Sequence, residues 1–88
     1  MLPTSESRDA IVSVLRRFVA DAFRDGRQDD LQGGTRLVSS GIVDSAGVVQ
    51  LVLFAENRFG VVIDDAEVKL ENFDTLDTLA DLIQRKGA

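Results

Sequence analysis

The chain has 88 residues and a net charge of -5, with 44% hydrophobic and 28% charged side chains, which fits one small globular domain over residues 1–88. It contains no cysteine and no histidine. Disulfides, thiolate metal sites, cysteine nucleophiles and histidine acid–base catalysis are therefore excluded. No paired-carboxylate pattern replaces them, so we expect a protein that is not an enzyme.

The acidic excess lies in the second half of the chain. Residues 1–36 carry six basic and six acidic groups, whereas residues 37–88 carry four basic and nine acidic groups. An acidic surface repels phosphate backbones and favours basic protein surfaces. No apolar run is long enough to cross a bilayer, and the first residues do not resemble a signal peptide. We expect a cytoplasmic monomer that binds proteins and neither nucleic acid nor membranes.

Residues 5–24 repeat apolar side chains with the period of a helix, and Thr4 or Ser5 can cap its start. The expected inward positions are Ile11, Leu15, Phe18 and Ala22, with Val12 and Val19 beside them. The positions expected on the opposite side are Ser13, Arg16, Arg17 and Ala20.

A polar, glycine-rich connection follows over residues 25–35. Connections of this length are uncommon in small domains unless they have a function or wrap the core. We expect Leu37, Ile42 and Val38 to anchor it. The spacing of its acidic residues does not fit an EF-hand loop, so we expect no calcium site.

A second helix is predicted over residues 45–59, with Gly60 as its C-cap. One face gathers Val48, Leu51, Val52, Ala55 and Phe59, and the flanks carry Val49, Leu53 and Phe54. This apolar arc is wider than a helix packed on one side requires. Either both flanks are buried or part of the arc meets a partner, and burial is the favoured interpretation.

The remaining chain predicts a short third helix and a final one. Residues 61–63 are β-branched but have no second strand to pair with, so they are expected to form a buried extended link. Residues 64–67 have the spacing of a capping box, which predicts a helix ending near residue 70 and broken by residues 72–75. Thr75 can cap the last helix. Its expected inward stripe is Leu76, Leu79, Ala80 and Ile83.

The segment SSGIVDS, residues 39–45, places Asp44 and Ser45 where the second helix begins. Unpaired N–H groups and the helix dipole make this position favourable for an anion such as a phosphate ester. Asp and Ser are also the usual N-caps of helices, so this dipeptide by itself favours plain capping.

Three motifs in this order and spacing resemble the acyl carrier protein and peptidyl carrier protein family: SGIVDS (40–45), QLVLFAENRFG (50–60) and ENFDTL (71–76). The resemblance spans about residues 37–83. It implies an all-α four-helix bundle of the acyl-carrier type, with a long loop between helices one and two and a short third helix. It also implies that Ser45 receives phosphopantetheine from coenzyme A through a phosphopantetheinyl transferase, with Asp44 helping to hold the divalent metal in that complex.

In such proteins the arm ends in a thiol that carries an acyl or aminoacyl group as a thioester. The implied partners are therefore an acyl- or aminoacyl-loading ligase or transferase and downstream biosynthetic enzymes. The chain departs from the family pattern at Ala46, where Leu or Ile is usual, and in having no acid in the second helix before Glu56. The missing acids disfavour fatty-acid enzymes as partners. The run QLVLF (50–54) followed by Glu56 resembles stand-alone carriers of secondary metabolism.

The resemblance implies two groups of contact residues. Partners are expected to touch Ala46, Val49, Leu53 and Val68, and cargo is expected to lie near Val62, Val68, Leu70 and Phe73. Helical spacing also explains each of these apolar residues as core, and for Leu70 and Phe73 the core is the favoured interpretation. The competing class is a non-catalytic acidic helical adaptor that binds a basic protein without covalent modification, and labelling with coenzyme A distinguishes the two.

Overall fold

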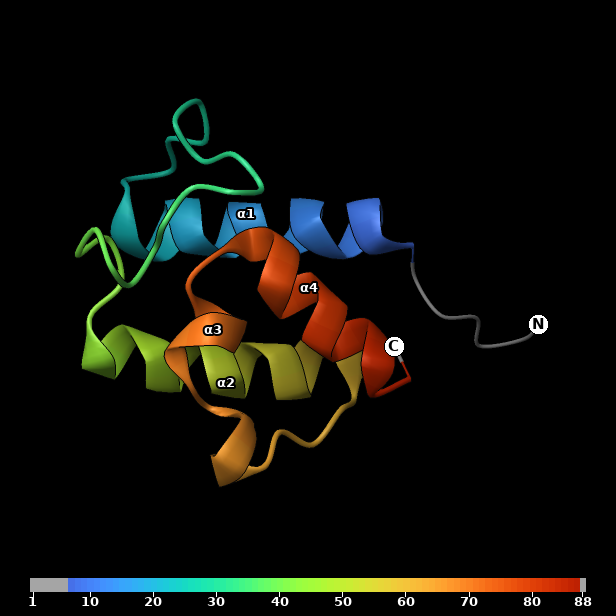
Figure 1. Cartoon of the computed structure of the whole chain (residues 1–88). Helices are drawn as coiled ribbons and strands as arrows, with labels where there is room; N and C mark the ends of the chain where they lie inside the picture. Colours follow the sequence, from blue (N-terminus) through green and yellow to red (C-terminus); the bar gives the residue numbers. More distant parts are fainter. Residues whose placement is uncertain (1–6, 88) are drawn as a thin grey trace.

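The computed structural model describes residues 7–87, which form four α-helices and no strand (Figure 1). The elements are α1 (Arg8–Phe23), α2 (Ser45–Phe59), the 3-10 turn η1 (Asp65–Glu67), α3 (Leu70–Phe73) and α4 (Leu76–Arg85). The long helices α1 and α2 run in opposite directions, and α4 packs against α1 and α3. This confirms the all-α fold with a long first connection and a short third helix. None of the described helices is long and apolar enough to span a membrane.

The start of α1 differs from the prediction. Ser7 is the N-cap, and its hydroxyl accepts a hydrogen bond from Ala10 N at 3.1 Å. Thr4 and Ser5, the predicted caps, lie outside the described residues, and the prediction of a cap there is wrong. Serines occur at both positions 5 and 7, and their spacing to the apolar stripe did not distinguish them.

The bounds of α2 and the cap of α4 agree with the sequence. α2 ends at Gly60, whose φ of 69° is left-handed and therefore favours glycine. Thr75 caps α4 by accepting a hydrogen bond from Thr78 N at 3.0 Å. Such a cap satisfies one of the free amides at a helix start.

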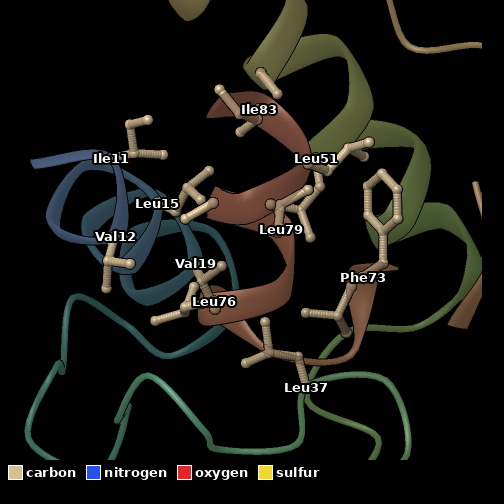
Figure 2. Packing of buried hydrophobic residues seen from close by; sticks show 14 of the residues in the cluster. Ile11, Val12, Leu15, Val19, Leu37, Leu51, Phe73, Leu76, Leu79 and Ile83 are labelled. Carbon is tan, nitrogen blue, oxygen red and sulfur yellow. The ribbon is translucent and has the colours of Figure 1, made fainter. Parts of the chain in front are cut away.

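The core lies between α1, α2 and α4, with Leu79 near its centre and Phe73 on the side next to α2 (Figure 2). The predicted stripe of α4 is buried in full, and Leu82 joins it. In α1 the prediction is wrong at two positions, because Ala20 is buried and Ala22 is exposed.

The long connection between α1 and α2 explains why α1 buries Ala20 rather than Ala22. Leu31 is buried against the helix, and Arg16 Nε donates a hydrogen bond to its carbonyl at 2.7 Å. The connection therefore covers the side of α1 that carries Arg16 and Ala20. Its other buried anchors are Leu37, as predicted, and Val43. The predicted anchors Ile42 and Val38 are only half-buried.

The segment after α2 alternates between core and solvent. Val61 and Ile63 are buried, whereas Val62 is 71% exposed. This period of two is that of extended backbone, so the predicted buried link is buried on one side only.

The predicted third helix is displaced along the chain. The capping box of Asp64 and Glu67 is present, but it closes only the turn η1. The backbone is extended at Lys69 (φ -141°, ψ 158°), and α3 then begins at Leu70. Asn72, expected to break the helix, lies within α3, and its side chain donates a hydrogen bond to the carbonyl of Glu67 at 2.9 Å. This contact links η1 to α3, whereas the sequence predicted one helix from residue 64 to about residue 70.

Candidate functional site

Ser45 is the first residue of α2 and is exposed. The N-cap is Asp44, whose Oδ1 accepts a hydrogen bond from Gly47 N at 2.8 Å. The capping role that the sequence left open therefore falls to Asp44. Because the Ser45 hydroxyl is not required to cap the helix, it is available for chemistry at the electropositive end of α2.

The turn that leads into α2 is fixed from inside the molecule. Gly41 has a φ of 86°, a conformation that other residues rarely adopt. Val43 is fully buried, and its amide donates a hydrogen bond to the carbonyl of Leu37 at 2.9 Å. Asp44 and Ser45 then emerge at the surface. The burial of Val43 thus fixes the point at which Ser45 is presented.

An open groove of about 290 Å³ adjoins Ser45. Its lining residues come from the first connection, α2 and the α3 region: Val38, Ser45, Val48, Val49, Val68, Lys69, Leu70 and Phe73. Most of the lining is apolar. Phe73 is a buried part of the core, whereas Leu70 is 55% exposed. The groove combines one hydroxyl, one ammonium group and an apolar wall.

The structure brings most of the predicted site residues together. Val49, Val68, Leu70 and Phe73 line the same groove as Ser45. Val62 does not line this groove, and its side chain is exposed to solvent.

Two further predicted contact residues lie on the surface of α2. Ala46 and Leu53 are exposed but lie outside the groove lining.

Three lining residues were missed by the sequence analysis. Val38 had been assigned as an anchor of the connection, and Val48 as part of the inner face of α2. Lys69 carried no pattern that marked it. Val38 and Lys69 line the groove from the first connection and from the extended backbone before α3, whereas Val48 lines it from the start of α2.

A stripe of exposed side chains runs along α2 from Ser45. Residues four positions apart lie on one side of a helix, so Ser45, Val49 and Leu53 form a single row. Val49 is 59% exposed and Leu53 is 54% exposed. The favoured interpretation that both flanks of α2 are buried is therefore wrong on this side. On the other flank, Phe54 is half-buried and stacks on Phe18 with ring centroids 4.2 Å apart.

Asp74 directly follows the lining residue Phe73, and its pKa is perturbed. Burial raises its pKa, but hydrogen bonds from Ser39, Arg36 and Val38 N lower the pKa by a larger amount, so that it falls from 3.8 to about 2. The carboxylate is therefore ionised at neutral pH although it is buried.

Glu67 is the second carboxylate with a perturbed pKa. A hydrogen bond from Lys86 Nζ, 2.7 Å away, and one from the amide of Asp64 lower its pKa. No cluster of three or more potential metal-binding side chains occurs among residues 7–87.

These features define a small helical protein that presents one serine hydroxyl at a helix start beside an apolar groove. No protein-family model matches the chain. It is 37% identical over 76 residues to the probable acyl carrier protein PigG from Serratia sp., an alignment that covers 86% of this chain and 87% of the relative. The chain therefore belongs to the acyl carrier protein family.

A solved structure supports the fold assignment. The chain matches, with a TM-score of 0.70 and 35% identity, a chain in a structure described as the crystal structure of an FAD-dependent dehydrogenase. The match covers 77% of this chain and 96% of that chain. The helical arrangement is thus shared over nearly the whole of the matched chain.

Proposed function

We propose that Ser45 bears phosphopantetheine and that the protein carries an acyl or aminoacyl group as a thioester to partner enzymes. The observation that carries the proposal is the exposed hydroxyl of Ser45 at the first residue of α2, in a member of the acyl carrier protein family. The unmodified adaptor is not favoured, because it gives no reason for a serine that is exposed, is not the helix cap and lies beside a groove.

The residues around Ser45 suit this prosthetic group. A phosphodiester on the hydroxyl would meet the positive end of the α2 dipole. The groove that begins at Ser45 offers an apolar wall for an arm or its cargo. When bound, the arm supplies the thiol that forms the thioester, which the chain itself lacks because it has no cysteine.

The chain contributes the nucleophile for its own modification. The Ser45 oxygen attacks the phosphorus that bears pantetheine in coenzyme A, forming a phosphodiester while the adenosine bisphosphate half leaves and the hydroxyl proton passes to a base of the transferase. Asp44 uses Oδ1 for the cap of α2. Its exposed carboxylate lies next to Ser45 in the chain, where it would help hold the divalent metal of the transferase complex.

The exposed row on α2 is the proposed docking surface for partner enzymes. Val49 and Leu53 present aliphatic side chains to solvent in line with Ser45, and Ala46 leaves the surface flat beside it. Val68 extends the surface across the groove. Aliphatic residues grouped in this way favour association with an apolar partner surface.

Cargo is proposed to rest against Leu70 and Phe73 in the groove. Val62 takes no part in this proposal, because it lies outside the groove lining. The apolar lining favours a small acyl or aminoacyl group with an uncharged body. The lack of acids early in α2 supports a dedicated biosynthetic pathway of secondary metabolism rather than general fatty-acid synthesis. A cytoplasmic location, expected from the sequence, is part of the same proposal.

The solved relative supports one class of partner. The matched 77% of the 88 residues amounts to about 68 residues, and these make up 96% of that chain, which is therefore about 71 residues long. A chain this short matches the size of the present one. The structure that contains this chain is described as that of an FAD-dependent dehydrogenase. We therefore include among the proposed partners a flavin-dependent dehydrogenase that acts on the loaded carrier. Reduction of the flavin by loaded but not by unloaded protein would test this partner.

The test of the main proposal is modification by a broad-specificity phosphopantetheinyl transferase with coenzyme A and magnesium. We expect intact mass to rise by one phosphopantetheine group. Ser45→Ala should abolish the addition. Ser40→Ala is the matched control, because Ser40 is also exposed and lies in the same turn, and this variant should be modified normally. An unmodified wild-type protein after treatment with several transferases would support the adaptor instead.

A further inference from the structure

Asp74 is the one buried charged residue in the part of the chain that the structure describes, with 3% of its surface exposed. It lies between α3 and the cap of α4. Its side chain accepts four hydrogen bonds from the first connection: from Val38 N at 2.9 Å, Ser39 N at 2.8 Å, Ser39 Oγ at 2.5 Å and Arg36 Nη1 at 3.2 Å. A single carboxylate thus holds a segment more than thirty residues away in the chain.

The backbone of Asp74 strengthens the same connection. Its carbonyl accepts a hydrogen bond from Leu37 N at 2.6 Å, and the carbonyl of Leu37 accepts one from Val43 N at 2.9 Å. Val43 is buried two residues before Ser45. A continuous set of hydrogen bonds therefore links the α3–α4 junction to the residues that present Ser45.

The carboxylate also joins two walls of the groove. Val38, held through its amide, lines the groove from the first connection. Phe73, which directly precedes Asp74, lines it from α3. The contacts of residues 36–39 with Asp74 therefore link these two walls directly, beside the buried side chain of Leu37, which anchors the same segment in the core.

We propose that Asp74 is a positioning residue of the carrier site, which holds residues 36–39 as a fixed wall and so sets the width of the groove beside Ser45. This proposal rests on the function proposed above for Ser45. Without the carboxylate, the wall formed by Val38 moves away from Phe73. Cargo that occupies the groove then becomes more accessible to water and to small nucleophiles.

The first experiment uses the unmodified protein and therefore does not depend on the function of Ser45. Amide hydrogen exchange is measured in wild type, Asp74→Asn and the milder Ser39→Ala, which removes only one hydrogen bond. We expect exchange at Val38 and Ser39 to accelerate about tenfold or more in Asp74→Asn, and less in Ser39→Ala, while amides in the middle of α1 keep their protection. Unchanged or uniformly faster exchange in both variants would overturn the positioning role.

The second experiment measures the site itself. Protein carrying a butyryl thioester on the arm is treated with hydroxylamine, and the rate of thioester cleavage is compared between wild type and the same two variants. Several-fold faster cleavage in Asp74→Asn, with a smaller increase in Ser39→Ala, is expected. Asp81→Asn is the matched control, because the Asp81 side chain is 45% exposed, pairs with Arg8 at 2.8 Å and does not line the groove.

The two experiments separate the possible failures. If no arm can be attached to wild-type protein, the proposed function fails, whereas the exchange experiment still reports on Asp74. If exchange accelerates locally but thioester cleavage is the same in all variants, the effect of Asp74 on the groove is refuted.

Discussion

The buried carboxylate of Asp74 predicts how the stability of the domain depends on pH. Burial raises the pKa of Asp74, but hydrogen bonds from Ser39, Arg36 and Val38 lower it more, to about 2. Its pKa in the unfolded chain is near the ordinary value of 3.8. Since the pKa is lower in the folded state, the ionised form stabilises the fold above about pH 4, and this contribution is lost as the pH falls toward about 2.

The size of the effect follows from the two pKa values. Each pKa unit corresponds to about 1.4 kcal/mol, so the fall from 3.8 to about 2 is worth about 2 kcal/mol. This is a large share of the stability of a small domain, which is typically about 5 to 15 kcal/mol. Asp74→Asn keeps the shape of the side chain but removes the charge. Its deficit in unfolding free energy should therefore be about 2 kcal/mol or more near pH 7 and should shrink near pH 2.

The assay is urea unfolding followed by circular dichroism, in wild type and Asp74→Asn, at several values between about pH 7 and about pH 2. Comparing the two proteins at each pH removes the contributions of other carboxylates, including Glu67, whose pKa is also lowered, by Lys86 and the Asp64 amide. Asp81→Asn serves as the exposed control. A difference between wild type and Asp74→Asn that stays constant across this range would show that the ionised carboxylate does not stabilise the fold.

Two further predictions concern packing. Leu79→Ala should lower the free energy of unfolding by about 2 to 5 kcal/mol in urea titrations, because Leu79 is fully buried at the centre of the core; a loss below about 1 kcal/mol would contradict this placement. Gly47→Ala should lower the thermal stability, although alanine favours helices by about 1 kcal/mol, because the added Cβ would lie 2.8 Å from Val43 Cγ1 and 2.9 Å from Phe23 Cε1. An increased melting temperature for this variant would show that the ring of Phe23 moves aside without cost.

The sequence predicted the elements whose signals are local. The bounds of α2, its glycine C-cap at Gly60 and the cap of α4 at Thr75 depend on a few neighbouring residues, and all three are confirmed. The family resemblance rested on such segments, which is why the fold class was predictable. The presentation of Ser45 at the start of α2 followed from the same local pattern.

The predictions that were wrong depend on contacts between distant segments. Ala20 is buried because the first connection returns over α1, and nothing within α1 encodes that return. The third helix is displaced because Asn72 bonds to Glu67 and the backbone extends at Lys69. The role of Asp74 was missed for the same reason, since its partners lie in residues 36–39.

The two flanks of α2 show why the width of an apolar arc could not be interpreted from sequence alone. Both flanks carry aliphatic or aromatic residues, and among residues 7–87 the flank with Phe54 packs against the ring of Phe18. The flank with Val49 and Leu53 stays exposed although burial of such side chains would be favourable by about 1.5 to 3 kcal/mol each. This exposed row begins at Ser45, so a partner enzyme that covers it would meet the proposed attachment point in the same contact.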